Sequence, residues 1–272
     1  MAGYGQRFVD AGYQDPKPTI MLQPSGRRII DYVVNTFDPT DKFIFICNED
    51  HLKDPRFRAT IYSRCKDAKV VSIPAHKRGP IHTIREAYDV IDDDDELIVA
   101  YCDGAIRFDQ SDFNFHVKAN NMDGCLFTHC GFHPHTLSST KMAFIRHEGI
   151  FVLEVKEKAC FTDNPQAEHA SSGVYYFGSG RIMKQCFDET VRRNIHYNGE
   201  FYVTLAYNVM IEAGQRVGYY STPHFACLGT PTEVRNFEAW NQLVKFGNVA
   251  TDADILKTFR YWQAFHQDAD RR

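Results

Sequence analysis

The sequence lacks several features that would mark out whole classes of protein. Its 272 residues contain no apolar run close to the roughly 18 residues that a membrane-spanning helix needs. The opening MAGYGQRFVD lacks the apolar stretch of a secretory signal peptide. Internal repeats, low-complexity stretches and linkers rich in proline or serine are also missing. We therefore expect a cytoplasmic globular protein with no membrane partner.

Charge and cysteine content exclude further classes. The chain has 31 basic and 35 acidic residues and a net charge of −4, so it lacks the basic excess of proteins that bind nucleic acid or anionic membranes. A local basic pocket for a polyphosphate is still compatible with this balance. None of the 8 cysteines forms a Cys-x-x-Cys pair, and several stand inside apolar runs as small buried residues do. We expect reduced thiols rather than a zinc site.

What is present is an ordinary globular composition, with 43% hydrophobic and 24% charged residues. In the first half, short apolar runs at 43–47, 69–73 and 97–101 read as buried strands. Helical periodicity covers 29–37 and 81–90. This alternation predicts an α/β fold with a mostly parallel sheet and helices on both faces.

The second half of the chain is more mixed. Several strands follow one another closely, and Arg146-His147-Glu148-Gly149 is typical of a hairpin turn. We predict one domain over 1–240 and a C-terminal helical extension over 241–272. The strands are expected at 125–128, 142–145, 150–155 and 173–177, and the helices at 182–191, 205–210, 234–244 and 255–265.

The first residues combine two glycines with two basic side chains. Gly3 and Gly5 can present backbone N–H groups to an anion without a Cβ in the way. Arg7 and Lys17 add positive charge, which suits a triphosphate. A lone Gly-x-Gly is more often a plain turn, but the following Arg and Pro-Lys make the combination more specific. It is neither a Walker loop, which needs Gly-Lys-Ser/Thr, nor a dinucleotide fingerprint, which needs a third glycine.

Four carboxylate and lysine positions are candidates for chemistry further along. Asp103 follows the apolar run LIVAYC, so it would emerge at the carboxyl end of a buried strand, where ligands sit in open α/β sheets. One carboxylate together with phosphate oxygens makes a normal Mg²⁺ site, although a strand-end turn with Gly104 is the alternative. On spacing alone, Glu157 and Lys158 are better explained as exposed charges in strand alternation than as a site pair. Glu200 is explained equally well as a site residue or as a helix-start carboxylate.

Two other polar segments have simpler interpretations. The acidic run at 92–96 is typical of a solvated loop between a helix and a strand. His129, His133 and His135 stand in a loop-like segment with proline and serine. Metal binding is the less favoured alternative for both segments.

Taken in order, these segments resemble the sugar-phosphate nucleotidylyltransferases. Ala2-Gly3-Tyr4-Gly5-Gln6-Arg7-Phe8 and Pro16-Lys17-Pro18 are similar to the family's signature loop, and the likeness continues to about residue 240. The later matches are Gly79-Pro80 with the second nucleotide loop, Asp103 with the metal-binding aspartate, Glu157-Lys158 with the pair that holds sugar and phosphate, SGVYYF at 172–177 with the strand beside the sugar, NGEFY at 198–202 with a further sugar contact, and Gly229-Thr230-Pro231 with the closing turn.

The resemblance implies a fold, an activity and a set of site residues. The fold would be Rossmann-like, with a smaller mixed or antiparallel sugar-binding part and C-terminal helices. The enzyme would transfer a nucleotidyl group from an NTP to a sugar 1-phosphate, with Mg²⁺, in nucleotide-sugar and polysaccharide biosynthesis. Its implied site comprises Arg7, Lys17, Asp103 and Lys158 as catalytic residues, Asp103 as the metal ligand, Ala2, Gly3, Gly5, Gly79 and Pro80 at the nucleotide, and Glu157, Lys158, Gly173 and Glu200 at the sugar.

The sequence departs from the family pattern twice. The signature loop usually follows a buried apolar strand, but the sequence begins at Met1, inside the motif. Either the sequence is a truncated version of a longer chain, or the sheet is completed differently. Many members also place a second aspartate where this chain has Cys227, and a neutral thiol is a poor Mg²⁺ ligand. Asp103 would then act with phosphates and water alone, another carboxylate would substitute, or the protein would bind without turnover.

Two alternative functions follow from this. One is a non-catalytic subunit that binds a nucleotide sugar. The other is a glycosyltransferase that uses a nucleotide sugar, although that group usually shows Asp-x-Asp and this chain has Cys102-Asp103-Gly104. The nucleotide base, the sugar and whether the chain forms a homo-oligomer stay open.

Overall fold

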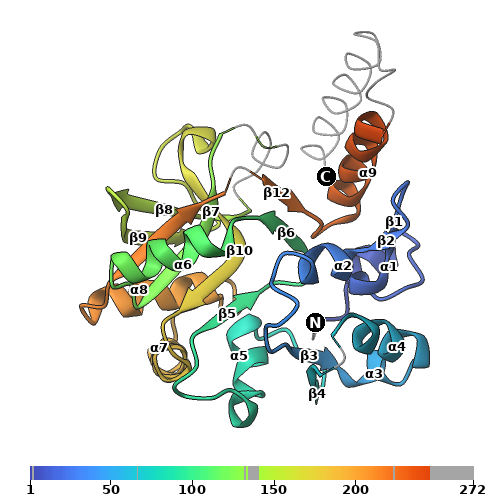
Figure 1. The fold of residues 1–272 in the computed structure, drawn as a ribbon, viewed down its shortest axis with the longest axis horizontal. Helices are drawn as coiled ribbons and strands as arrows, with labels where there is room; N and C mark the ends of the chain where they lie inside the picture. Colours follow the sequence, from blue (N-terminus) through green and yellow to red (C-terminus); the bar gives the residue numbers. More distant parts are fainter. Residues whose placement is uncertain (2, 66, 132, 134–140, 223, 246–272) are drawn as a thin grey trace.

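A six-stranded sheet forms the centre of the computed structural model (Figure 1). The structure describes residues 1–272 except 2, 66, 132, 134–140, 223 and 246–272. The strand order is β5-β10-β7-β11-β9-β8. The strands are β5 (Leu97–Ala100), β7 (Gly124–His129), β8 (Ala143–Glu148), β9 (Phe151–Glu157), β10 (His169–Phe177) and β11 (Val217–Ser221).

The strand directions correct the prediction of a mostly parallel sheet. Strands β5 and β7 run in one direction, but β10 lies between them and pairs antiparallel with both. The parallel pairs are β11 with β7 and, in a separate two-stranded sheet, β3 (Ile44–Asn48) with β4 (Lys69–Ile73). Strand β9 is antiparallel to β8 and to β11, so it runs in the same direction as β10. The fold is α/β as predicted, with the antiparallel part larger than the sequence indicates.

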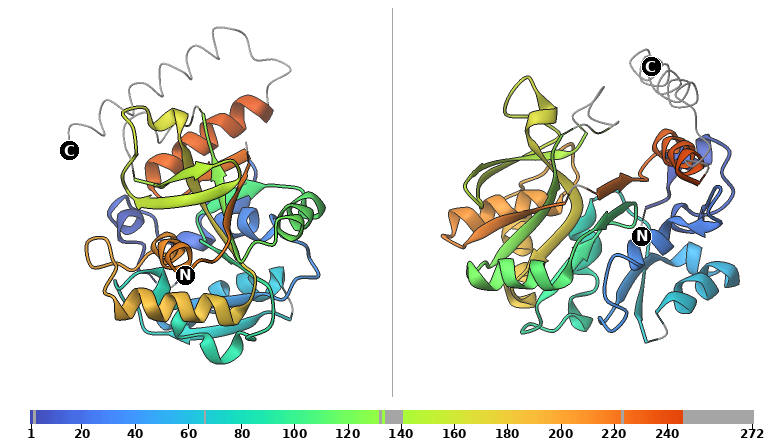
Figure 2. Two further views of the ribbon diagram at one scale, coloured as in Figure 1. Left: turned by 90° about the vertical axis from the view of Figure 1, so that its left-hand side faces the viewer. Right: turned by 45° about the horizontal axis from the view of Figure 1, so that its top comes forward.

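Alternate side chains of β7 face two separate hydrophobic layers, as the pleat of a strand requires. Leu126 faces the layer formed with α7 (Gly180–Arg192) and α8 (Val203–Glu212). Phe127 faces the layer formed with α6 (Gln110–Ala119). Helices therefore cover both faces of the sheet, as predicted (Figure 2). Helix α7 begins at Ser179, whose hydroxyl accepts a hydrogen bond from Ile182 N–H at 3.2 Å.

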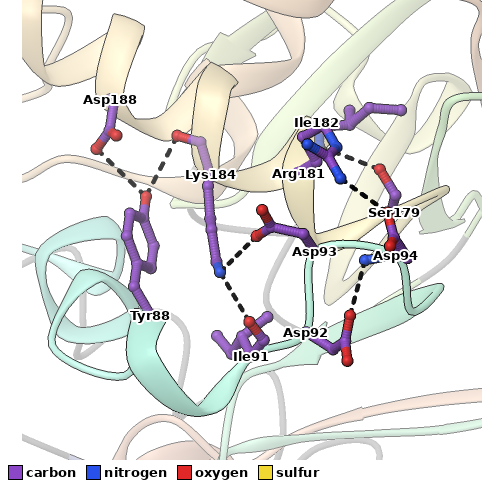
Figure 3. Close-up of polar contacts among 10 residues, drawn as sticks. All are labelled: Tyr88, Ile91, Asp92, Asp93, Asp94, Ser179, Arg181, Ile182, Lys184 and Asp188. Carbon is purple, nitrogen blue, oxygen red and sulfur yellow. Dashed lines mark hydrogen bonds and ion pairs between the residues drawn. The ribbon is translucent and has the colours of Figure 1, made fainter.

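The acidic run at 92–96 is tied to α7 (Figure 3). Lys184 donates to Ile91 O and to Asp93 Oδ1, both at 2.7 Å, and Arg181 pairs with Asp94 at 2.9 Å. The run is a loop between η2 (Tyr88–Val90) and β5, as predicted, but its carboxylates meet basic groups as well as solvent. The predicted helix at 81–90 is in fact α5 (Pro80–Arg85) followed by η2.

The N-terminal segment and the last described helix share one hydrophobic cluster. Phe8, Leu22 and Ile29 pack with Leu228 and Val234. Helix α9 (Pro231–Lys245) runs through residue 240, where we placed the start of the extension, and the predicted helix at 255–265 lies outside the described residues. The N-terminal elements are α1 (Gln6–Asp10), η1 (Lys17–Thr19), β1 (Met21–Leu22), β2 (Arg27–Arg28) and α2 (Ile29–Val34).

Met1 lies along the edge of β3. Its ammonium donates to Ile46 O at 2.8 Å, and its carbonyl accepts from Asn48 N–H at 3.3 Å. Ala100 of β5 packs against the cluster that contains Phe45, although β3 and β5 belong to different sheets. The remaining elements are α3 (Glu49–Leu52), α4 (Pro55–Arg64), β6 (Gly104–Arg107), η4 (Pro165–Ala167) and β12 (His224–Cys227).

Two further observations concern the whole described part of the chain. None of its helices has the length and apolar character needed to cross a bilayer. Within it, no group of three or more His, Cys, Asp and Glu side chains is arranged to hold a metal ion by itself. His129, which we expected in a loop, is instead the last residue of β7, where it is buried with Nδ1 3.1 Å from Ser172 Oγ. His135 falls outside the described residues.

Candidate active site

The glycine loop lies directly over Lys17. Gly5 adopts φ +65°, a left-handed conformation that favours glycine, and its carbonyl accepts from Phe8 N–H at 2.8 Å as α1 begins. A Cβ on Gly5 would lie 3.6 Å from Lys17 Cβ, so the loop and the lysine are in contact. Arg7 is exposed on α1, and nothing lies within 4 Å of a Cβ built on Gly3. The loop is thus open on the side where a ligand would approach, and Ala2 lies outside the described residues.

Lys17 forms a largely buried ion pair with Asp103. The ammonium bonds Asp103 Oδ2 and lies 3.4 Å from Gly229 O, and the two side chains are 18% and 28% exposed. Burial alone would lower the pKa of Lys17, but Asp103, together with Cys102 and Cys227, outweighs it and the pKa is raised. Lys17 therefore stays positively charged. The structure brings these two predicted residues together from 86 positions apart in the sequence.

Strand pairing places Cys227 beside this ion pair. Strands β6 and β12 run antiparallel with Cys227 opposite Gly104, and Leu228 N–H donates to Asp103 O at 2.7 Å. Burial, followed by the carboxylates of Glu233 and Asp103, raises the pKa of the Cys227 thiol well above its usual range. Without a metal the thiol therefore stays protonated, and a thiol is a poor ligand for a hard cation such as Mg²⁺.

A second polar network lies at the end of β9. Lys158, at φ +55°, donates to Tyr202 Oη at 2.6 Å, and that hydroxyl donates to Glu200 Oε2 at 2.6 Å. Thr204 Oγ1 donates to Glu157 Oε2 at 2.5 Å. The predicted residues Glu157, Lys158 and Glu200 thus form one cluster. No sequence pattern points to Thr204, because its contact with Glu157 depends on how α8 packs against β9.

The second glycine loop is tied to this network. Gly79 has φ +91° and precedes α5, with Pro80 as the first helical residue. Phe201 N–H donates to Arg78 O at 3.0 Å, and Phe201 O accepts from Ile81 N–H at 3.1 Å. These two bonds hold the loop against the segment that carries Glu200.

The buried side chain of Tyr175 lies near both polar networks. The carboxylates of Glu157 and Asp103 both help burial to raise the pKa of Tyr175. Gly173 has φ +75° at an irregularity of β10, and its carbonyl accepts from Tyr101 N–H at 2.9 Å. Gly173 therefore lies beside the end of β5, and its role at the sugar stays a prediction.

Glu157 makes the stability of the protein depend on pH. Burial raises the pKa of Glu157 from 4.5 to about 7, although the Thr204 hydrogen bond and Lys158 oppose the shift. The folded state therefore binds the proton more tightly than the unfolded state, so stability is lost as pH rises from about 4.5 through 7. We expect Glu157→Gln to gain on the order of 2 kcal/mol relative to wild type between pH 5 and pH 8 in urea unfolding. An equal difference at both pH values would contradict this.

Comparison with known proteins agrees with this geometry. Residues 1–125 match the family model described as MobA-like NTP transferase domain. The predicted resemblance to nucleotidylyltransferases is thereby confirmed, and the matched residues include the glycine loop, Lys17, Gly79 and Asp103. No curated protein matches the chain in sequence.

Solved structures share the fold of this protein over most of the chain. A nucleoside-diphosphate-sugar pyrophosphorylase from Vibrio cholerae RC9 has a TM-score of 0.69 at 23% identity, covering 88% of this chain and 97% of that one. A UTP-bound UGPase from Acinetobacter baumannii has a TM-score of 0.65 at 17% identity, covering 89% of this chain and 91% of that one. A putative glucose-1-phosphate thymidylyltransferase from Bacillus anthracis has a TM-score of 0.65 at 14% identity, covering 88% of this chain and 91% of that one. At these identities the likeness shows the fold.

Proposed function

We propose that this protein transfers a nucleotidyl group from an NTP to a sugar 1-phosphate, releasing pyrophosphate and an NDP-sugar. The observation that carries the proposal is the Lys17–Asp103 pair beneath the Gly5 loop, at the carboxyl end of β5. The family match over residues 1–125 and the pyrophosphorylase fold support it.

The proposed reaction needs positioning and positive charge more than acid–base catalysis. An oxygen of the sugar phosphate, already ionised, forms a bond to the α-phosphorus while the bond from that phosphorus to the bridging oxygen breaks. Arg7 and Lys17 neutralise the triphosphate and the departing pyrophosphate. Lys158 holds the attacking phosphate, and the buried carboxylate of Glu157, with Glu200, accepts hydrogen bonds from sugar hydroxyls.

Asp103 is suited to a magnesium ion shared with the substrate. Mg²⁺ prefers oxygen ligands and usually keeps several waters, so one or two carboxylates with phosphate oxygens suffice. Asp103 offers a carboxylate beside the Gly5 loop, whereas the protonated Cys227 does not fit the role. When bound, Mg²⁺ would neutralise phosphate charge next to Lys17.

Pyrophosphate release tests the proposed function. The protein is incubated with Mg²⁺, each of four NTPs and a panel of sugar 1-phosphates, because structural neighbours are named for both uridine and thymidine nucleotides. We expect release that requires both substrates, and a loss of at least about a hundredfold in Asp103→Ala. Release that Asp103→Ala leaves unchanged would contradict the proposal.

The protonated Cys227 favours a second candidate, a nucleotide-sugar binding subunit without turnover. It predicts that the folded protein binds an NTP or NDP-sugar in calorimetry but releases no pyrophosphate with any pair in the panel. Binding without release would therefore replace the first proposal by the second.

A further inference from the structure

The first turn of α9 carries a carboxylate that the sequence analysis did not single out. Thr230 Oγ1 accepts from Glu233 N–H at 3.3 Å, and Pro231 is the first helical residue. Thr-Pro-x-Glu is a good helix start, because an acidic side chain near the N-terminus is favoured by the helix dipole. This explains why a carboxylate is tolerated at 233, but it does not explain where its oxygens lie.

The Glu233 side chain faces Asp103. A Cβ built on Gly229 would lie 3.2 Å from both Asp103 Oδ2 and Glu233 Oε2, and 3.7 Å from Cys227 Sγ. The two carboxylates and the thiol therefore border one small volume, which the glycine leaves open. Lys17 reaches the same place, since its ammonium bonds Asp103 Oδ2 and lies 3.4 Å from Gly229 O.

Glu233 Oε2 lacks a good hydrogen-bond partner in this place. The atom is buried and has no partner at ordinary hydrogen-bond geometry. The Cys227 thiol borders the same volume, but it is only a weak hydrogen-bond donor. A buried carboxylate oxygen without a partner costs free energy, and a bound cation would remove that cost.

We propose that Asp103 and Glu233 together bind the divalent cation, with Glu233 supplying from α9 the second carboxylate that Cys227 does not provide. Water and phosphate oxygens complete the shell, as is usual for Mg²⁺. Lys17 then compensates Asp103 when no cation is bound and is free to meet the triphosphate when one is. This inference deepens the proposed function and rests on it.

Mn²⁺ binding to the full chain tests this assignment without any turnover, with free Mn²⁺ followed by its electron paramagnetic resonance signal. We expect Glu233→Gln and Asp103→Asn each to weaken Mn²⁺ binding at least tenfold. Glu238→Gln is the matched control on the same helix, where the carboxylate accepts from Gln23 N–H at 2.8 Å and an amide oxygen can do the same. It should bind within twofold of wild type.

Thermal unfolding is a second test of Mn²⁺ binding. Mn²⁺ should raise the midpoint of wild type and Glu238→Gln more than that of Glu233→Gln, because only a ligand of the folded state stabilises it. If Glu233→Gln does not fold, Glu233→Asp replaces it, and its shorter side chain should weaken Mn²⁺ binding at least threefold.

Wild-type affinity for Mn²⁺ in the folded Glu233 variant, or no Mn²⁺ binding by wild type, would overturn the inference. Either result can be told apart from failure of the proposed function. That failure is the absence of pyrophosphate release from a protein whose Mn²⁺ binding still depends on both carboxylates.

Discussion

Replacing Lys17 with alanine is expected to lower pyrophosphate release about a thousandfold, or about 4 kcal/mol of transition-state stabilisation. The ammonium lies under the Gly5 loop and stays charged because Asp103 raises its pKa. Charge builds up on the departing pyrophosphate, so losing this cation costs more in the transition state than in the bound substrate. We therefore expect kcat to fall far more than KM rises in steady-state kinetics.

Lys42→Ala is the control for the Lys17 variant. Lys42 also pairs with an aspartate, Asp95, at 3.2 Å, but its side chain is 87% exposed and stands outside the site. Its removal should leave kcat and KM unchanged within twofold, since exposed ion pairs contribute little. A Lys17→Ala protein that folds, by circular dichroism, and keeps more than a tenth of wild-type kcat would exclude the Gly5 loop as the triphosphate site.

Gly79→Ala is expected to destabilise the protein by at least about 3 kcal/mol in urea unfolding. Its φ of +91° is unfavourable for alanine, and the added Cβ would lie 2.5 Å from Phe201 N and 2.8 Å from Phe201 O. Those atoms are backbone and cannot move aside without breaking the two hydrogen bonds that join the Gly79 loop to the Phe201 segment. We expect nucleotide and sugar-phosphate binding to weaken together.

Gly199→Ala separates the cost of the backbone conformation from the cost of the steric clash. Gly199 has a similar φ of +79°, but nothing lies within 4 Å of its added Cβ. It should cost about 1 kcal/mol, the penalty of the backbone conformation alone. Equal destabilisation by the two variants would show that the close approach of Gly79 to Phe201 is not what holds this loop.

The sequence predicted the local elements well and the pairing of strands poorly. Residues 69–73 form β4 as predicted, because a short apolar run rich in branched side chains identifies a buried strand on its own. The direction of β10 was missed because a strand's own residues do not state which neighbour it joins. The short β6 and β12 lack a periodic pattern long enough to detect.

For the candidate site too, the sequence predicts individual residues better than their long-range contacts. The family resemblance predicts Lys17, Asp103, Glu157 and Lys158 as site residues, but no spacing rule predicts that Lys17 contacts Asp103. Glu233 escaped notice because its sequence signal is that of an ordinary helix start. Its place beside Asp103 depends on the β6–β12 pairing, which is a long-range contact.

The cluster shared by the N-terminal segment and α9 has a consequence for synthesis of the chain. Phe8 and Leu22 emerge from the ribosome early, but Leu228 and Val234, which cover them, are added only near the end of the described residues. Until then the nascent chain exposes that apolar surface, and the Gly5 loop has no fixed support. A chain stalled or clipped before α9 would keep Arg7, Lys17 and Asp103 and yet lack an ordered place to bind a nucleotide.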